Sequence, residues 1–283
     1  LLTATLVVIV ATLAFAPFLF PGAKPLNVAA KICVFALLVA SYDLLLGYTG
    51  IVSFAHTMFY GIGSYGIAIA LYGMGPGWGA VFIGLAVALP LAALLALGIG
   101  LFSLRVQAIF FAMITLAVAS AFAVLASQLS WLTGGEDGRT FQIPEALRPA
   151  FTLLPKDALG VAVTGRTLAY YLVFLGAAAL ILLLLRVVNS PFGRVLQAIR
   201  ENPFRAEALG YRIVVHRSLA NTLGALLAAA AGALNALWLR YAGPDTSLSF
   251  AIMMDILVMV VIGGMGTIYG AIVGAAVFIL APN

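Results

Sequence analysis

The stretch TLAYYLVFLGAAALILLLLRVV (residues 167–188) decides the class of fold, because it is a continuous apolar run whose only charge, Arg186, lies near its end. About 20 apolar residues in helical conformation cross a bilayer core that is about 30 Å thick. A strand of a membrane barrel would instead alternate polar and apolar residues. A helix also satisfies its own backbone hydrogen bonds inside the membrane. The stretch therefore predicts a membrane-spanning α-helix.

Runs of the same kind recur over the whole chain. Of its 283 residues, 64% are hydrophobic and 8% are charged, and the mean hydropathy is +1.18. A soluble domain is about 45–50% apolar and about 25% charged, and it could not hide this much apolar surface from water. We therefore predict an all-α fold, a polytopic membrane helix bundle that forms a single transmembrane domain over residues 1–283. The apolar runs predict about nine membrane segments, at residues 1–20, 26–46, 51–72, 78–104, 106–129, 167–188, 218–241, 250–262 and 267–280.

The first and the last of these segments need separate interpretation. Residues 1–20 have neither a charged leading region nor a small-residue cleavage site, so we interpret them as a span and not as a signal peptide. The segments 250–262 and 267–280 are shorter than the roughly 20 residues of a full crossing. We expect these two segments to be tilted or to cross only part of the membrane.

The charges and the reactive residues exclude several classes of function. The net charge is +5, but the basic residues border the apolar runs, so we assign them to membrane topology and expect no nucleic-acid partner. None of the three lysines is followed by Ser or Thr, which excludes a P-loop. Cys33 is the only cysteine, and the two histidines are far apart, so we predict no metal or cofactor. Because no nucleophile motif is present either, we predict no catalytic residues and no enzyme activity.

Directly after the opening stretch, the charge of the protein gathers in residues 189–217, which include SPFGRVLQAIRENPFRAEALG (190–210). Ser190 and Pro191 are a helix-start signal, Pro203 interrupts the helical pattern, and Gly210 is a helix-stop signal. The stretch predicts two short helices joined by a bend, which would form a compact knob on the cytoplasmic surface. The alternative is a plain loop whose arginines only fix the topology.

A second polar connection, residues 131–166, contains TGGEDGR and IPEALRPAFTLLPKDALG. Basic residues are enriched in cytoplasmic loops, which places residues 189–217 in the cytoplasm. Residues 131–166 are then predicted to be an external loop.

The stretch SYDLLLGYTGIVSFAHTMFYGIGSYG (41–66) combines five glycines with polar residues at membrane depth, among them Asp43, His56 and Ser64. Ionisable groups in a membrane are costly and usually face a bundle interior or a water-filled path. Two roles therefore remain open for these residues: they line a path, or they hold the bundle together by interhelical hydrogen bonds. The candidates for lining a translocation path are Tyr42, Asp43, His56, Phe59, Tyr60 and Ser64.

The stretch MMDILVMVVIGGMGTIYGAIVGAA (253–276) carries Gly266, Gly270 and Gly274 at intervals of four residues. This spacing places the three glycines on one helix face. Helix packing is the favoured interpretation of the stripe, ahead of contact with a substrate.

Four stretches in this order resemble one family: DLLLGYTGIVSFAHTMFYGIGSY, LTGGEDG, SPFGRVLQAIRENPFRAEALG and VMVVIGGMGTIYGAIVGAA. From about residue 31 onward, the chain resembles the M-type permease subunit of bacterial ABC importers for branched-chain amino acids. The resemblance implies a multi-pass protein of the bacterial inner (cytoplasmic) membrane. The implied partners are a paired related permease subunit, two ATPase subunits, a periplasmic substrate-binding protein and the lipid bilayer.

The resemblance also implies a role for the charged connection. In this family the cytoplasmic loop between spans docks on the ATPase subunit, on which ATP is hydrolysed. The residues that the resemblance assigns to ATPase coupling are Arg194, Arg200, Glu201, Arg205, Glu207 and Gly210. The family often has no proline at the position of Pro203, so the second short helix departs from the family pattern there.

Alternatives to this function are an importer of the same family for urea, amides or small aromatic acids, and a proton-coupled secondary transporter. In the second alternative, Asp43, His56 and Asp255 would form a proton relay. ATPase and binding-protein partners would favour the importer, and proton-driven uptake by the isolated chain would favour the secondary transporter.

Overall fold

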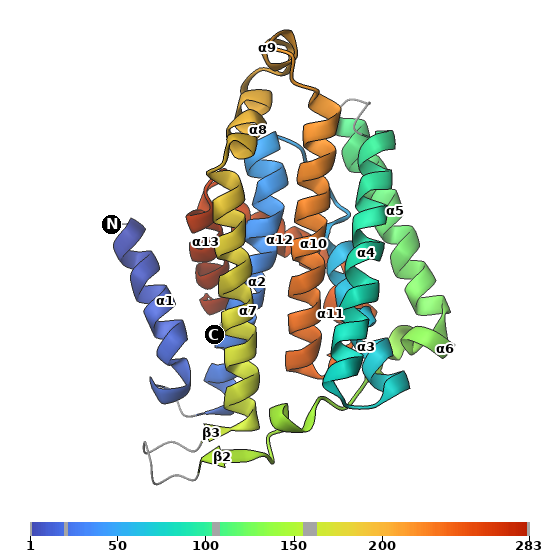
Figure 1. Ribbon diagram of the computed structural model, residues 1–283, viewed down its shortest axis with the longest axis vertical. Coiled ribbons are helices and arrows are strands. Elements are labelled where there is room, and N and C mark those ends of the chain that lie inside the picture. The colour runs from blue at the N-terminus through green and yellow to red at the C-terminus, as the bar shows by residue number, and fades with distance from the viewer. Residues whose placement is uncertain (1, 20–21, 104–107, 155–162, 282–283) are drawn as a thin grey trace.

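The computed structural model describes residues 2–19, 22–103, 108–154 and 163–281, and Figure 1 shows a bundle of long helices. Residues 1, 20, 104, 106 and 107 of the predicted segments and residues 155–162 of the predicted external loop lie outside the described residues. The longer helices are α1 (Leu2–Leu19), α2 (Ala23–Thr49), α3 (His56–Met74), α4 (Trp78–Ser103), α5 (Ala108–Gln128), α7 (Gly165–Val188), α8 (Pro191–Glu201), α10 (Ile213–Leu239), α12 (Phe250–Gly263) and α13 (Ile268–Leu280).

Short elements connect these helices. Four of these short elements are strands, which form two antiparallel pairs. Strand β1 pairs with β4, which follows α10, and β2 pairs with β3. The prediction of an all-α fold is therefore right for the bundle and incomplete for the loops. The short elements are α6 (Ser130–Thr133), η1 (Gly135–Asp137), β1 (Arg139–Thr140), η2 (Glu145–Leu147), β2 (Thr152–Leu154), β3 (Val163–Thr164), α9 (Pro203–Ala208), β4 (Tyr241–Ala242) and α11 (Pro244–Ser247).

The prediction of about nine membrane segments is not confirmed. Among the described residues, six helical stretches are long and apolar enough to cross a membrane. The apolar part of α1 and the whole of α13 are shorter, and α13 has only 13 residues, where about 20 are needed. The six candidate spans are Ala23–Thr49, Trp78–Leu101, Ile109–Gln128, Gly165–Val188, Ile213–Leu239 and Pro244–Gly263.

The centre of the bundle is α2, whose candidate span is 89% buried inside the molecule. It packs against α10, α13 and α7, and α10 in turn packs along α3 and α4. Small residues allow this close packing: a Cβ at Gly63 of α3 would overlap the carbonyl oxygen of Ala229 in α10. In the same way, a Cβ at Gly232 would overlap the carbonyl oxygen of Tyr60.

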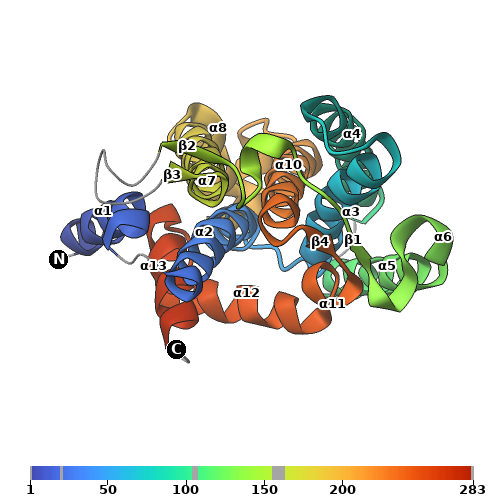
Figure 2. The same cartoon turned by 90° about the horizontal axis from the view of Figure 1, so that it is seen from below.

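One helix does not follow the direction of the others. Viewed along the bundle in Figure 2, α12 lies across it, between α11 and α13. Its candidate span, Pro244–Gly263, qualifies by length and composition alone. The sequence predicted a tilted or partial span at residues 250–262, and the structure places α12 crosswise in the bundle.

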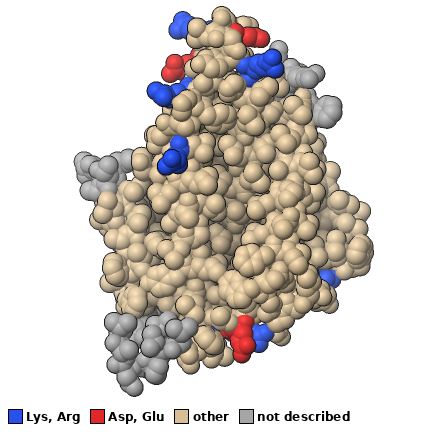
Figure 3. All heavy atoms as spheres, in the orientation of Figure 1, with Lys and Arg blue, Asp and Glu red and all other residues tan. Residues whose placement is uncertain are grey.

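Charged side chains mark the two ends of the molecule. On the face shown in Figure 3, Lys, Arg, Asp and Glu gather at the upper end, where α8 and α9 lie, and at the lower end. The broad region between the two ends is almost uncharged on this face. A multi-pass membrane protein has this distribution because charged groups are costly inside the bilayer.

Candidate functional site

The connection between α7 and α10 has the local structure that its sequence predicts. Pro191 is the first residue of α8, and α9 begins at Pro203. Between them, Asn202 is extended (φ −154°, ψ 98°), as expected for a residue that precedes proline. The Asn202 Oδ1 atom accepts the backbone N–H of Arg205 at 3.0 Å and so caps α9. After α9, Gly210 has a φ of +90°, which glycine adopts at little cost.

The first helix of this connection is attached to the bundle. The side chains of Leu196 and Ile199 are fully buried on its inner face. A Cβ at Gly193 would overlap the carbonyl oxygen of Val188, so glycine permits α8 to pack closely on the end of α7. Helix α8 is therefore a fixed part of the molecule.

Arg200 extends the attachment of α8 to two further elements. Its Nη1 donates a hydrogen bond to the carbonyl oxygen of Gly47, near the end of α2. The same Nη1 would lie 2.9 Å from a Cβ at Gly266, and the Arg200 Cγ 3.2 Å from a Cβ at Gly50. Gly50 and Gly266 therefore leave the space that the arginine side chain occupies.

Asp43, in α2, binds the same glycine, Gly266, that Arg200 approaches. Its carboxylate is 1% exposed, and its Oδ1 and Oδ2 accept the N–H of Gly266 at 2.9 and 3.2 Å. Gly266 lies in the turn between α12 and α13. We call Asp43, Gly47, Arg200 and Gly266 the Arg200 junction. It joins α8, α2 and the α12–α13 turn.

The opposite side of the connection is open to solvent, and we call it the outer pole. Glu201, Arg205 and Glu207 are exposed there, together with two apolar side chains, Phe204 and Leu209. Phe204 is 84% exposed and Leu209 is 72% exposed. A cavity of about 270 Å³ lies between the end of α8 and α9. These two apolar residues were not predicted from the sequence, although an apolar residue directly after Pro203 was a usable signal.

The remaining predicted coupling residues lie on the same connection. The Arg194 side chain is exposed on α8, on the side opposite to Leu196. Gly210 is exposed in the turn that follows α9.

The six candidates for lining a path lie inside the subunit, where the side chains of Tyr42, Asp43, His56, Phe59, Tyr60 and Ser64 are at most 1% exposed. Three of them join helices: Asp43 bonds to Gly266, His56 Nε2 lies 2.8 Å from Ser41 Oγ, and Ser64 Oγ donates to the Gly232 carbonyl at 2.9 Å. Of the two roles left open by the sequence, this geometry supports interhelical bonding.

The protonation of His56 follows from its neighbour. The Ser41 hydroxyl donates its hydrogen to the Leu38 carbonyl at 2.7 Å. The bond to His56 therefore needs Nε2–H as the donor, which leaves a lone pair on Nδ1. Within the described residues, neither this Nδ1 nor the hydroxyl of Tyr60 has a hydrogen-bond partner.

Two of the three glycines of the predicted stripe pack against the same helix. Gly270 and Gly274 lie in α13, and a Cβ on either would overlap a backbone carbonyl of α12, from Gly263 and Met259 respectively. Gly266 lies outside α13, with a φ of +87°, and belongs to the Arg200 junction. The packing face against α12 therefore includes Gly270 and Gly274, and Gly266 is not part of it.

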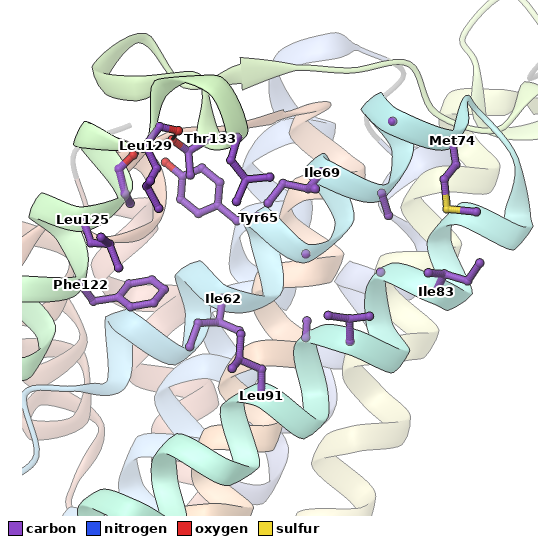
Figure 4. Close-up of a pocket in the computed structure, with 18 residues that line it drawn as sticks. Ile62, Tyr65, Ile69, Met74, Ile83, Leu91, Phe122, Leu125, Leu129 and Thr133 are labelled. Carbon is purple, nitrogen blue, oxygen red and sulfur yellow. Dashed lines mark hydrogen bonds between the residues drawn. The ribbon is translucent and has the colours of Figure 1, made fainter.

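A large cavity in the bundle is apolar. It has a volume of about 700 Å³ and lies between α3, α4 and α5, where Ile62, Ile83 and Phe122 line it (Figure 4). None of its lining residues is charged. In the part of the chain that the structure describes, no group of three or more His, Cys, Asp or Glu residues could hold a metal ion.

Together, the apolar spans, the uncharged middle and the charged pole define a multi-pass helical membrane protein. A family model described as branched-chain amino acid transport system / permease component matches residues 24–283. The chain belongs to this family, whose members are transport permeases, and the resemblance seen in the sequence is confirmed.

Two curated relatives agree with this family. Both are described as a high-affinity branched-chain amino acid transport system permease protein LivM, one from Salmonella typhimurium (strain LT2) and one from Escherichia coli (strain K12). They are 27% and 26% identical to this chain over 272 residues, which cover 90% of it. The match covers 62% of the length of each relative. No solved structure matches the chain.

Proposed function

We propose that this chain is the permease subunit of an ATP-driven ABC importer in a bacterial inner membrane. Its substrates would be branched-chain or other hydrophobic amino acids, in keeping with the family and with the names of the two relatives. A paired related permease, two ATPase subunits and a periplasmic binding protein would complete the importer. The observation that supports this proposal most is the connection formed by α8 and α9.

This connection has the two properties that a mechanical contact needs. Its inner face is fixed to the bundle by Leu196 and Ile199, and the exposed Arg200 adds a hydrogen bond to the Gly47 carbonyl. Its outer pole offers two exposed apolar side chains surrounded by charges of both signs. Apolar anchors within a polar rim are typical of protein–protein interfaces. The outer pole therefore suits a groove on a soluble ATPase.

The Arg200 junction connects the outer pole to the helices of the bundle and would transmit a movement of the ATPase subunits to them. ATP binding would shift the ATPase subunits and, with them, the outer pole. Because Arg200 and Asp43 join α8 to α2 and to the α12–α13 turn, a displacement of α8 would move these elements together. Such movements of packed elements convert a permease between outward and inward states. Hydrolysis itself is assigned to the ATPase subunits, so the chain is not an enzyme.

Reversal of one charge at the outer pole tests the proposal. In Glu207→Lys, ATPase binding should weaken about thirtyfold or more, because an unmatched interface charge costs about 2 kcal/mol or more. ATP-driven uptake of L-leucine by proteoliposomes that contain the full complex should fall accordingly. The matched control is Glu145→Lys, a charge reversal at an exposed residue of η2 in the predicted external loop.

Two results would contradict the proposal. One is unchanged ATPase binding and uptake in Glu207→Lys. The other is proton-driven uptake by the isolated chain, which would indicate a secondary transporter.

A further inference from the structure

The connection between α2 and α3, residues 50–55, lies alongside the candidate span of α2, and we therefore assign it to the depth of the membrane. His56 is the first residue of α3, and its Nε2 bonds to Ser41, which lies eight residues before the end of α2 at Thr49. With a rise of about 1.5 Å per residue, α3 begins about 12 Å below that end. Figure 1 shows the connection descending beside α10 toward the level of α12.

The carbonyl groups of this connection are poorly satisfied, although most of its N–H groups have acceptors. The N–H groups of Gly50 and Ile51 bond to the Leu45 carbonyl. The N–H of Phe54 bonds to Thr115 Oγ1 at 3.0 Å, and that of Ala55 bonds to Ser53 Oγ at 3.4 Å. From residue 50 to residue 54, no backbone carbonyl accepts a hydrogen bond from another described residue. Lipid cannot cover such a segment, because the hydrocarbon core offers no hydrogen-bond donors.

The same segment is open on one side. Gly50 is exposed, and Val52 and Phe54 are half-buried. A cavity of about 310 Å³ separates these residues from α5, where Ile109 and Met113 face them. The ring of Phe54 lies 6.2 Å from the ring of Phe250 at the start of α12, measured between centroids. Apolar side chains therefore lie next to backbone carbonyls that accept no hydrogen bond from other described residues.

We propose that residues 50–54, with Phe250 of α12 and Met113 of α5, line a water-filled translocation path. Water satisfies the free carbonyls when the path is empty. The ammonium group of an amino acid donates to them during passage, while Phe54 and Phe250 contact its apolar side chain. This inference rests on the proposed function and moves the path away from the fully buried Tyr42, His56 and Tyr60.

Single cysteines test the presence of water in the assembled importer. In a Cys33→Ala background, Val52→Cys, Phe54→Cys and Met113→Cys would be treated with a charged, membrane-impermeant methanethiosulfonate. The matched controls are Leu94→Cys in α4 and Leu182→Cys in α7, at positions that are 68% and 65% exposed on apolar helix surfaces. Because only the thiolate reacts, cysteines in water should react at least about tenfold faster than cysteines in lipid.

We expect all three test cysteines to exceed both controls, and ATP with L-leucine-loaded binding protein to change their reaction rates. Rates equal to those of the controls, in a complex that still takes up L-leucine, would overturn the inference, because the segment would then be covered by protein. If the test cysteines react quickly but the complex shows no ATP-driven uptake, the water-filled path would be supported. The proposed ATP-driven importer would then be rejected. The two failures are therefore distinguishable.

Discussion

Asp43 is a buried carboxylate that accepts the N–H of Gly266 with both of its oxygens. An asparagine at this position retains one acceptor oxygen, whereas alanine leaves the partly buried N–H of Gly266 without this partner. We expect Asp43→Ala to lower the free energy of unfolding by about 1–3 kcal/mol. Asp43→Asn should lose less than Asp43→Ala. Thermal unfolding in detergent measures both changes, and equal losses in the two variants would argue against the hydrogen bond.

Arg200 is the residue that links α8 to the end of α2. In Arg200→Ala, we expect ATP hydrolysis to continue while L-leucine uptake per ATP falls by roughly tenfold, because a hydrogen bond from a charged group contributes about 1.5–3 kcal/mol. The control is Arg212→Ala, which removes an exposed arginine of the same connection. Equal uptake per ATP in the two variants would reject Arg200 as the link.

At the scale of elements, the contact between α3 and α10 depends on glycine. A Cβ at Gly63 would overlap a backbone carbonyl, which cannot move aside, whereas a Cβ at Gly98 in α4 would meet no atom within 4 Å. We expect Gly63→Ala to destabilise the protein, and Gly98→Ala to be neutral or stabilising by up to about 1 kcal/mol, the difference in helix propensity. Folded yield and thermal unfolding of both variants provide the measurement, and equal behaviour would contradict the close approach of the helices.

The elements also differ in how far their sequences predicted them. Pro191, Pro203 and Gly210 act on their immediate neighbours, so the two helices and the bend in this connection followed from sequence. The strand β1 did not follow, because it pairs with β4, which lies about 100 residues later. Helix α3 was expected to begin with the apolar run at residue 51, but Gly50 and the residues after it form the membrane-depth connection instead.

At the scale of the whole molecule, the orientation in the membrane is a prediction. The outer pole should face the cytoplasm, and the strand-bearing loop that contains Glu145 should face the exterior. In intact cells, an impermeant thiol reagent should label Glu145→Cys and not Phe204→Cys, both in a Cys33→Ala background. Inside-out vesicles should give the opposite pattern. Labelling of Phe204→Cys from the exterior would reverse the topology and remove the basis of the proposed ATPase contact.

The sequence by itself determined the class of the molecule and the position of its charged connection. Long apolar runs require a membrane whatever their neighbours, and the proline and glycine signals act over a few residues. Only the tertiary structure decided which residues meet at the Arg200 junction, where Asp43 and Gly266 are 223 positions apart. It also decided that α3 begins at membrane depth and that α12 lies across the bundle. These features depend on how the helices pack, and packing is set by contacts between distant parts of the chain.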